Sequence, residues 1–164
     1  MTVRLAIPTD AQALADMANA QRLLIEAIFG PRDPWTLDFA QKVIARDRAV
    51  YVYENPTIQA FMRVVDAEWG EHGVGFWLSQ AGSLTQRIAR FKRAIREFAP
   101  AWFPAAAARG APLCTFHWKD SERSFSRTAG WDKLGQFGTQ VVDENGMRWW
   151  YVTPQQGLDG AATV

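Results

Sequence analysis

Two spacings of hydrophobic residues, one of period two and one of three to four, divide the chain into short strands and amphipathic helices. Val3 to Ile7 alternates hydrophobic and polar residues, which predicts a strand. From Leu14 to Ile28 the hydrophobic residues recur at steps of three and four, so a helix is expected there, with Thr9 or Asp10 as its N-cap. The chain therefore opens with a strand that leads into a helix.

A second helix is expected after Pro34, capped by Thr36 and packing inward through Phe39, Val43 and Ile44. The pattern then changes to runs of β-branched and aromatic residues separated by turn residues. Strands are expected over 49–53, 58–65, 73–78, 113–118, 141–142 and 149–152. The first two of these should form an antiparallel hairpin, because the residues between them are typical of a turn.

The strongest helical pattern in the chain begins after Ser83. Ser83 and Gln86 match a capping box, in which each side chain binds the backbone amide of the other residue. From Leu84 to Trp102 hydrophobic residues alternate steps of four and three, and basic residues fill most of the other faces. Pro100 and Pro104 are expected to distort or end this helix.

The remaining segments complete one α+β domain with a mixed sheet. A short helix is expected from Asp120 or Ser121 to Gly130, and Asn145-Gly146 is expected to form a type I′ turn between the last two strands. The strands before and after the long helix should lie parallel, because a helical crossover returns the chain in the same direction. We expect this domain over residues 1–153 and a flexible tail over 154–164.

Composition and charge exclude several classes of protein. A chain of 164 residues, 48% of them hydrophobic, can bury a core without disulfides or a structural metal. The net charge of +1 removes any global attraction to nucleic acid or to an anionic membrane. Cys114, His72 and His117 have no metal-ligand spacing, and the lone cysteine indicates a reducing compartment. No signal-peptide run or stretch of ~20 apolar residues is present, so a cytoplasmic protein is expected.

The order of these elements, an Arg4-x-Ala-x-Pro-x-Asp10 opening and a Gly130-Trp131 pair resemble the GNAT (Gcn5-related N-acetyltransferase) superfamily over residues 1 to about 153. The resemblance implies a GNAT-like acyl-CoA N-acyltransferase fold. In an active member it implies that acetyl-CoA binds between the fourth and fifth strands. Its pyrophosphate would then lie on backbone amides at the start of the long helix, where unpaired N–H groups and the helix dipole favour an anion.

A narrower resemblance is to GNAT-like proteins of tailed phages, which include internal virion proteins. It rests on the basic helix from Thr85 to Phe98, the aromatic strand Phe116-His117-Trp118, the short helix from Ser121 to Ala129 and the Asn145-Gly146 hairpin. This resemblance implies a protein of the host cytoplasm or of the virion. Its partners would be other virion proteins or a second copy of itself.

The pyrophosphate loop departs from the family pattern Arg/Gln-x-x-Gly-x-Gly/Ala. Gln80 and Gly82 are present, but their spacing is one residue short, and Leu84 stands where a second small residue is expected. The cofactor-binding residues implied by the resemblance are Gln80, Gly82, Ser83, Thr85 and Arg87. Either Gly82, Ser83 and Thr85 still bind an anion, or Ser83 and Gln86 only cap the helix; the second interpretation is favoured, since short motifs match often by chance.

The family's catalytic acid, a Tyr a few residues before the Gly-Phe pair, falls here on Ser126, whose hydroxyl is far less acidic. Candidate bases are Glu68 and Glu71, in the turn between the third and fourth strands, and His117 on the fifth, since imidazole titrates near neutrality. The competing interpretation is a packed histidine and two solvated glutamates. Glu68, His117 and Ser126 are therefore the candidate catalytic residues.

Basic residues on the long helix leave the partner open. Arg87, Arg90 and Arg93 could bind the phosphates of CoA or of nucleic acid, or could form a solvated face. The incomplete loop and the missing Tyr favour a GNAT-fold phage protein that acts through protein contacts and needs no cofactor. The alternative is an acetyl-CoA-dependent N-acetyltransferase that acts on a small-molecule or protein amine.

Overall fold

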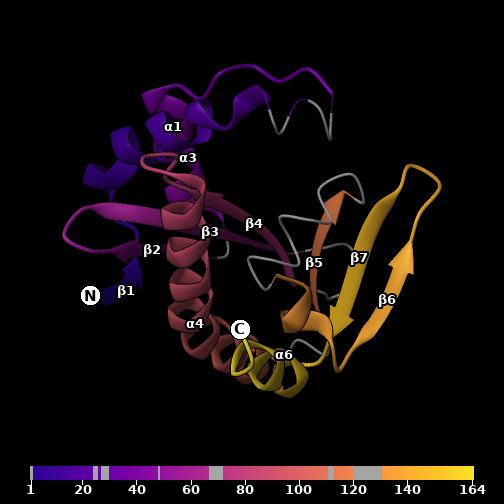
Figure 1. Ribbon diagram of the computed structural model, residues 1–164. Helices are drawn as coiled ribbons and strands as arrows, with labels where there is room; N and C mark the ends of the chain where they lie inside the picture. Colours follow the sequence, from indigo (N-terminus) through magenta and orange to yellow (C-terminus); the bar gives the residue numbers. More distant parts are fainter. Residues whose placement is uncertain are drawn as a thin grey trace.

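A single mixed sheet runs through the molecule (Figure 1). The computed structural model describes residues 2–23, 26, 30–47, 49–66, 72–110, 113–119 and 131–164, with the backbone alone at 66, 72–75, 116–119 and 131. Its strands are β1 (Thr2–Leu5), β2 (Ala49–Glu54), β3 (Ile58–Asp66), β4 (His72–Leu78), β5 (Cys114–Lys119), β6 (Thr139–Val142) and β7 (Met147–Val152). They lie in the order β1-β2-β3-β4-β5-β7-β6. All neighbours are antiparallel except β4 and β5, which confirms the parallel crossover expected from the long helix.

Helices cover both faces of the sheet. On one face lie α1 (Ala11–Ala20) and α3 (Leu37–Arg46), and on the other α4 (Leu84–Ala108), with α6 (Pro154–Ala161) packed against it (Figure 1). In β2, Tyr51 and Tyr53 join the core beneath α4, whereas Val50 and Val52 join the core beneath α1 and α3. A strand buried on both faces is a continuous hydrophobic run, which explains the composition of β2.

Pro100 and Pro104 do not end α4, which continues to Ala108. The rings of Pro100 and Pro104 are exposed, while Phe98, Trp102 and Phe103 are buried against the sheet and α6. Packing of this buried face offsets the hydrogen bonds that the prolines remove. The capping box at the start of the helix is confirmed, since Ser83 and Gln86 bind each other's amides.

The flexible tail expected over 154–164 is wrong. Thr153 and Gln156 form a second capping box, and α6 packs against α4 and the 3-10 turn Trp131–Gly135. Two glycines that suggested a loose segment allow this packing: a Cβ on Gly157 would lie 2.1 Å from Phe103 Cζ. The small residues therefore mark a close helix–helix contact.

Three local expectations also need correction. Phe39 is 43% exposed, and Ala40, its neighbour in α3, is the fully buried residue in its place. The helix expected from Leu14 to Ile28 is interrupted at Gln21: α1 ends at Ala20, the described residues 22, 23 and 26 are again helical, and Ile28 lies outside the described residues. In the last hairpin only Gly146 has a positive φ, 73°, so Asn145-Gly146 is not a type I′ turn. Three residues separate Asp143 from Met147, a loop in which a glycine with positive φ follows a turn.

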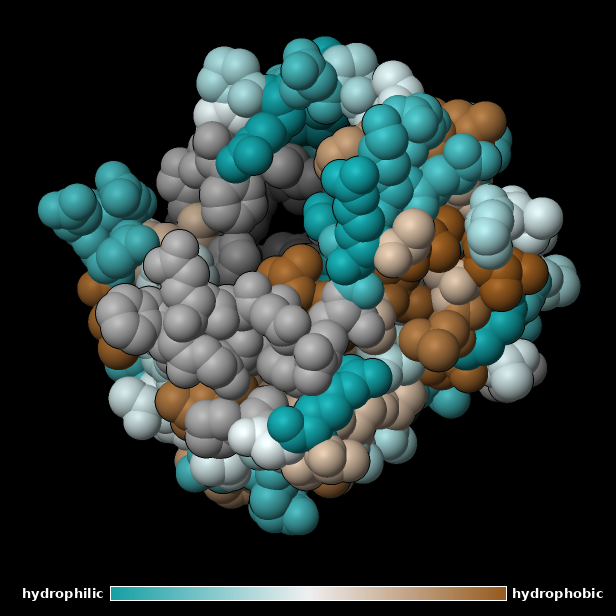
Figure 2. All heavy atoms as spheres, turned by 180° about the vertical axis from the view of Figure 1, so that it is seen from behind, coloured by the Kyte–Doolittle hydropathy of each residue, from teal (hydrophilic) through white to brown (hydrophobic). Residues whose placement is uncertain are grey.

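In the view from behind, the described residues of the surface mix hydrophobic and hydrophilic side chains. Figure 2 shows hydrophobic residues gathered on the side of the N-terminal strands and interspersed with hydrophilic ones. The exposed hydrophobic residues of the β1 region are Leu5 and Ile7. Scattered residues of this kind are normal on a protein surface. None of the described helices combines the length and the hydrophobicity of a membrane span.

Candidate functional site

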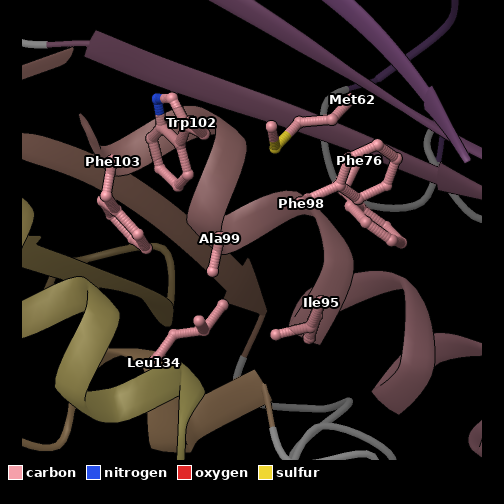
Figure 3. Close-up of a pocket in the computed structure, with 8 residues that line it drawn as sticks. All are labelled: Met62, Phe76, Ile95, Phe98, Ala99, Trp102, Phe103 and Leu134. Atoms are coloured by element: carbon pink, nitrogen blue, oxygen red, sulfur yellow. The ribbon is translucent and has the colours of Figure 1, made fainter. Parts of the chain in front are cut away.

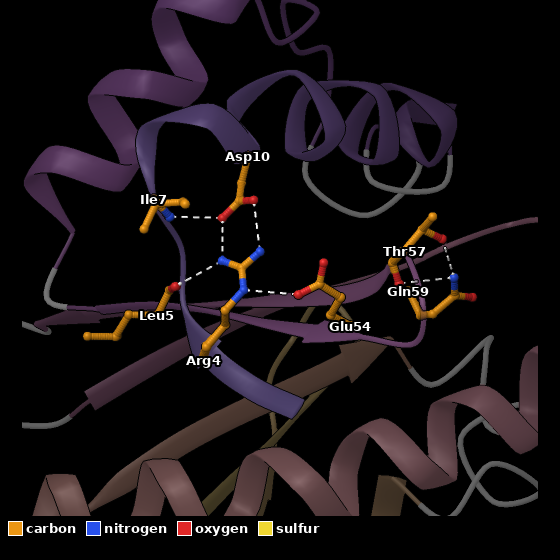
Figure 4. Close-up of polar contacts among 7 residues, drawn as sticks. All are labelled: Arg4, Leu5, Ile7, Asp10, Glu54, Thr57 and Gln59. Carbon is orange, nitrogen blue, oxygen red and sulfur yellow. Dashed lines mark hydrogen bonds and ion pairs between the residues drawn. The ribbon is translucent and has the colours of Figure 1, made fainter. Parts of the chain in front are cut away.

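The opening Arg4-x-Ala-x-Pro-x-Asp10 motif is a structural ion pair (Figure 4). Arg4 donates from Nη1 and Nη2 to the two carboxylate oxygens of Asp10, at 2.7 and 3.0 Å, and from Nε to Glu54 Oε2 at 3.1 Å. Asp10 also accepts the backbone N–H of Ile7 at 2.8 Å, so its side chain does not cap α1. The motif ties β1 to β2 and to the start of α1 and leaves no reactive group.

The Arg4 guanidinium lowers the pKa of Asp10, and the Ile7 amide adds to this effect. Burial of the carboxyl acts in the opposite direction but is the smaller influence. An ionised carboxylate that accepts two charge-assisted hydrogen bonds is favoured over its protonated form. Asp10 therefore belongs to the scaffold and is not a general base.

Strands β4 and β5 meet only at one end. Their register pairs His72 with Cys114 and Gly73 with Thr115, and no further pair joins them in the described residues, although β4 continues to Leu78. The parallel strands are therefore joined at their amino ends only. The loop that follows Leu78 leads directly into α4, so the free end of β4 and the start of α4 belong to one region.

Gly82 shapes the loop between β4 and α4. Its φ is +86°, a conformation that L side chains adopt only with strain. A Cβ at this position would also lie 2.4 Å from Gln86 Oε1. Gln86 Oε1 accepts the amide of Ser83 at 2.7 Å, so the glycine makes room for the cap.

The cap leaves part of the helix start free to bind an anion. It uses the amides of Ser83 and Gln86. Among the described residues, none accepts a hydrogen bond from the amides of Gly82, Leu84 or Thr85, and these three residues are exposed. Capping and anion binding, which the sequence presents as alternatives, are therefore compatible here.

Two of the basic residues are turned toward the loop. Arg87 Nη1 donates to Gln80 Oε1 at 2.9 Å, and Gln80 Nε2 donates to the Leu78 carbonyl at 2.9 Å. Arg90 Nη1 donates to the carbonyls of Ser79 and Ala81. Farther along the helix, Arg96 donates to the Val164 carbonyl. The positive cluster is thus divided among separate side-chain and backbone contacts, and Arg90 is half-buried against the loop instead of forming part of a solvated face.

The candidate catalytic residues are only partly within the described structure. Glu68, Glu71 and Ser126 lie outside the described residues. His117 pairs with Trp149 across β5 and β7, and its backbone alone is described. The structure therefore brings Gln80, Gly82, Ser83, Thr85 and Arg87 together at one loop, while the acid and base stay predictions.

Cys114 does not add a nucleophile to this region. The thiol is fully buried in β5, and burial raises its pKa to about 12. A thiol that stays protonated at neutral pH is a poor nucleophile. Cys114 is a core residue.

The sequence marks Arg90 as a possible phosphate-binding residue but does not predict its contact with the loop. A signal exists, because Arg87 and Arg90 are three positions apart and therefore lie on one side of the helix. The Gln80 contact of Arg87 shows that this side faces back to the loop. The spacing alone does not show whether that side of the helix faces the loop or the solvent.

A small cavity beneath α4 is a packing gap (Figure 3). It measures about 10 Å³ and lies among hydrophobic side chains that include Phe76, Trp102 and Leu134. That volume is at the lower limit for a single water molecule, ~10–15 Å³. It is too small for any part of a cofactor.

No family model and no curated protein sequence matches the chain. Solved structures do match. The Salmonella typhimurium protein yncA, proposed as an acetyltransferase and solved with its cofactor acetyl-CoA, has a TM-score of 0.70 at 14% identity, over 93% of both chains. A variant of spermidine N-acetyltransferase from Vibrio cholerae has a TM-score of 0.64 at 11% identity, over 97% of this chain and 98% of that one.

A third match is aminoglycoside acetyltransferase AAC(6')-Ib in complex with coenzyme A and kanamycin. Its TM-score is 0.60 at 17% identity, over 94% of this chain and 95% of that one. The structural similarity shows a shared fold, and at sequence identities this low it shows the fold alone. The chain has the GNAT acyltransferase fold, as its element order and opening motif predict.

Proposed function

We propose that the chain is an acetyl-CoA-dependent N-acetyltransferase that acts on a small-molecule amine. Two features at one end of the sheet carry the proposal. β4 and β5 part after Gly73 and Thr115. The amides of Gly82, Leu84 and Thr85, where β4 leads into α4, have no hydrogen-bond acceptor among the described residues. Solved proteins of this fold hold acetyl-CoA or coenzyme A.

The residues of this loop fit a diphosphate. Unpaired amides at the start of a helix of 25 residues present N–H donors and the positive end of the helix dipole. Leu84 replaces the family's second small residue, and its side chain is 54% exposed. In this proposal the amides of Gly82, Leu84 and Thr85 contact the diphosphate, Ser83 caps the helix, and Gln80 and Arg87 hold the loop behind them.

Acetyl-CoA would supply the acetyl group as a thioester. The chain must in addition accept a proton from the amine and protect the site from water. Glu68 and His117 remain the candidate proton acceptors, and Ser126 stands at the position of the usual proton donor. A serine there is a weaker acid, so we expect slow turnover.

Solved proteins of the same fold support a small-molecule amine as the acceptor. The solved proteins of this fold are named for small polyamine and aminoglycoside amines, and one of them holds kanamycin. Binding of nucleic acid through Arg87, Arg90 and Arg93 is less favoured, since Arg87 and Arg90 donate to groups of the loop.

A non-catalytic protein of the same fold is the second candidate function. The short loop motif and Ser126 at the acid position favour it. The phage virion role that goes with the narrower resemblance gains no support from the comparisons, which are with acetyltransferases.

Calorimetry with acetyl-CoA tests the proposal directly. A ligand that binds only the folded state raises the free energy of unfolding by ~2.7 kcal/mol at a hundredfold excess over its dissociation constant. Release of CoA thiol should then follow on addition of a polyamine or an aminoglycoside. No heat and no thermal shift at millimolar acetyl-CoA would refute the enzyme and favour the non-catalytic candidate.

Two glycine variants provide a matched pair for this experiment. Gly82→Ala and Gly146→Ala each place a side chain at a positive φ, +86° and +73°, and this backbone strain costs ~1–2 kcal/mol in either place. The Cβ on Gly82 in addition displaces the Gln86 side chain, whereas a Cβ on Gly146 meets no neighbouring atom. Only Gly82 lies at the loop. Acetyl-CoA affinity should therefore fall in Gly82→Ala and stay at the parent value in Gly146→Ala.

A further inference from the structure

We infer that Arg90 is a positioning residue that turns the Gly82 amide outward, toward the diphosphate of the cofactor. The inference rests on the proposed function, because the amide needs an anion to bind. Arg90 lies in the second turn of α4 and is half-buried. Its Nη1 atom donates to the Ser79 carbonyl at 2.7 Å and to the Ala81 carbonyl at 3.0 Å.

One nitrogen atom thus gathers two carbonyl groups of the same loop. In a trans peptide the C=O of one residue and the N–H of the next point in opposite directions. Because the Ala81 carbonyl is directed at Arg90, the N–H of Gly82 is directed away from it. The amide that points away is one of the three without an acceptor among the described residues.

The neighbouring contacts hold the same arrangement. Ser79 donates its own amide to the Gln59 carbonyl in β3 at 2.8 Å, which fixes the start of the loop. The next residue, Gln80, is held by two contacts of its side chain, which donates to the Leu78 carbonyl and accepts from Arg87. Arg90 is the contact that fixes Ala81, the residue directly before the Gly82 amide.

The role differs from simple attraction between a cation and a phosphate. Attraction depends on charge alone, so a lysine would serve equally well. Positioning depends on one planar nitrogen with two hydrogens that reach two carbonyls at once. The variant Arg90→Lys separates the two, since it keeps the charge and removes the guanidinium.

The experiment measures the affinity of Arg90→Lys for CoA and for pantetheine, which lacks the diphosphate. We expect about tenfold weaker binding of CoA, the loss expected for one hydrogen bond to a charged group. Pantetheine affinity should be unchanged. In turnover, the KM for acetyl-CoA should rise by about the same factor while kcat stays within about twofold.

Arg109→Lys is the control. Arg109 is exposed at the C-cap of α4, at the opposite end of the helix from the loop. It should bind CoA as the parent does. Parent-like CoA binding by Arg90→Lys would overturn the inference and leave the proposed function standing, whereas a parent that binds no CoA would overturn both.

A measurement on the parent protein guards against a variant that does not fold. Addition of CoA to ¹⁵N-labelled parent should shift the amide signal of Gly82 together with those of Leu84 and Thr85. A Gly82 signal that stays in place while CoA binds would overturn the inference without any variant.

Discussion

Arg4 and Asp10 show how a short motif can be diagnostic of a fold and still have no part in its chemistry. The Asp10 side chain is 9% exposed and is held between a guanidinium and a backbone amide. Replacing either partner would leave the other partly buried charge unpaired. The motif therefore reports on how β1, β2 and α1 are joined.

Asp10→Asn should destabilise the protein by ~1.5–3 kcal/mol at pH 7, the range for hydrogen bonds to charged groups. Because the folded-state pKa of Asp10 lies below its unfolded value of about 3.9, its stabilisation is complete above about pH 5, begins to decrease near the unfolded value and is lost as the pH falls on through the folded-state pKa. Urea melts between pH 7 and pH 3 should show the gap between parent and variant closing at low pH. Asp33→Asn, at an exposed residue, should show no gap at any pH; a gap in Asp10→Asn that is independent of pH would contradict this account.

At the scale of elements, the rotation of α4 about its own axis decides which of its side chains face the core. Phe91 is 7% exposed, and its ring lies 5.0 Å from that of Phe76 in β4, edge to face. Leu84, two turns earlier in the same helix, is 54% exposed.

Phe91→Ala should cost ~3–5 kcal/mol, a large share of the ~5–15 kcal/mol that stabilises a typical domain. Leu84→Ala removes a hydrophobic side chain from solvent and should cost less than ~0.5 kcal/mol. Denaturant midpoints measure the difference. Equal midpoints would mean that α4 is rotated from the position described here.

The packing of α6 on α4 gives a second prediction for an element. Gly157→Ala would place a methyl group 2.1 Å from Phe103 Cζ, so the two helices must separate. We expect a cost of ~1–3 kcal/mol from overpacking. Gln155→Ala, at an exposed position of the same helix, serves as the control. A Gly157→Ala variant as stable as the parent would show that α6 does not dock in this way.

At the scale of the whole molecule, the sheet consists of two parts that meet at β4 and β5. The joint has two register pairs, whereas β2 is paired along its length with β3 and also with β1. Amides on the β5 side of β4 beyond Gly73 therefore lack a strand partner among the described residues.

Hydrogen exchange should reveal this joint and its ligand. In the free protein, peptides covering Gly75 to Leu78 should exchange faster than peptides covering β2, because unpaired amides open locally. Acetyl-CoA should slow exchange in the β4 peptides and leave β2 unchanged. Equal protection of the β4 and β2 peptides in the free protein would contradict the pairing of β4 and β5 at one end only.

Much of the fold could be predicted from local patterns. The hairpin of β2 and β3, the crossover through α4 and the Ser83 cap depend on interactions close in sequence or on the periodicity of a single element. α6 could not be predicted, because the same small residues suit a loose tail and a close helix contact. The difference lies in Phe103, which is 54 residues before Gly157 in the chain.

The candidate site shows the same division between what the sequence by itself determined and what tertiary structure decided. The residue types of the loop, the glycine with positive φ and the capping box could all be identified from the sequence, because turn and cap chemistry involve neighbouring residues. Only the folded chain decided that Arg90 faces the loop rather than solvent, and that β4 and β5 part after two pairs. The first depends on the rotation of α4 over the sheet, which is set by hydrophobic contacts between residues far apart in sequence, and the second depends on strand pairing between His72 and Cys114, which are also far apart in sequence.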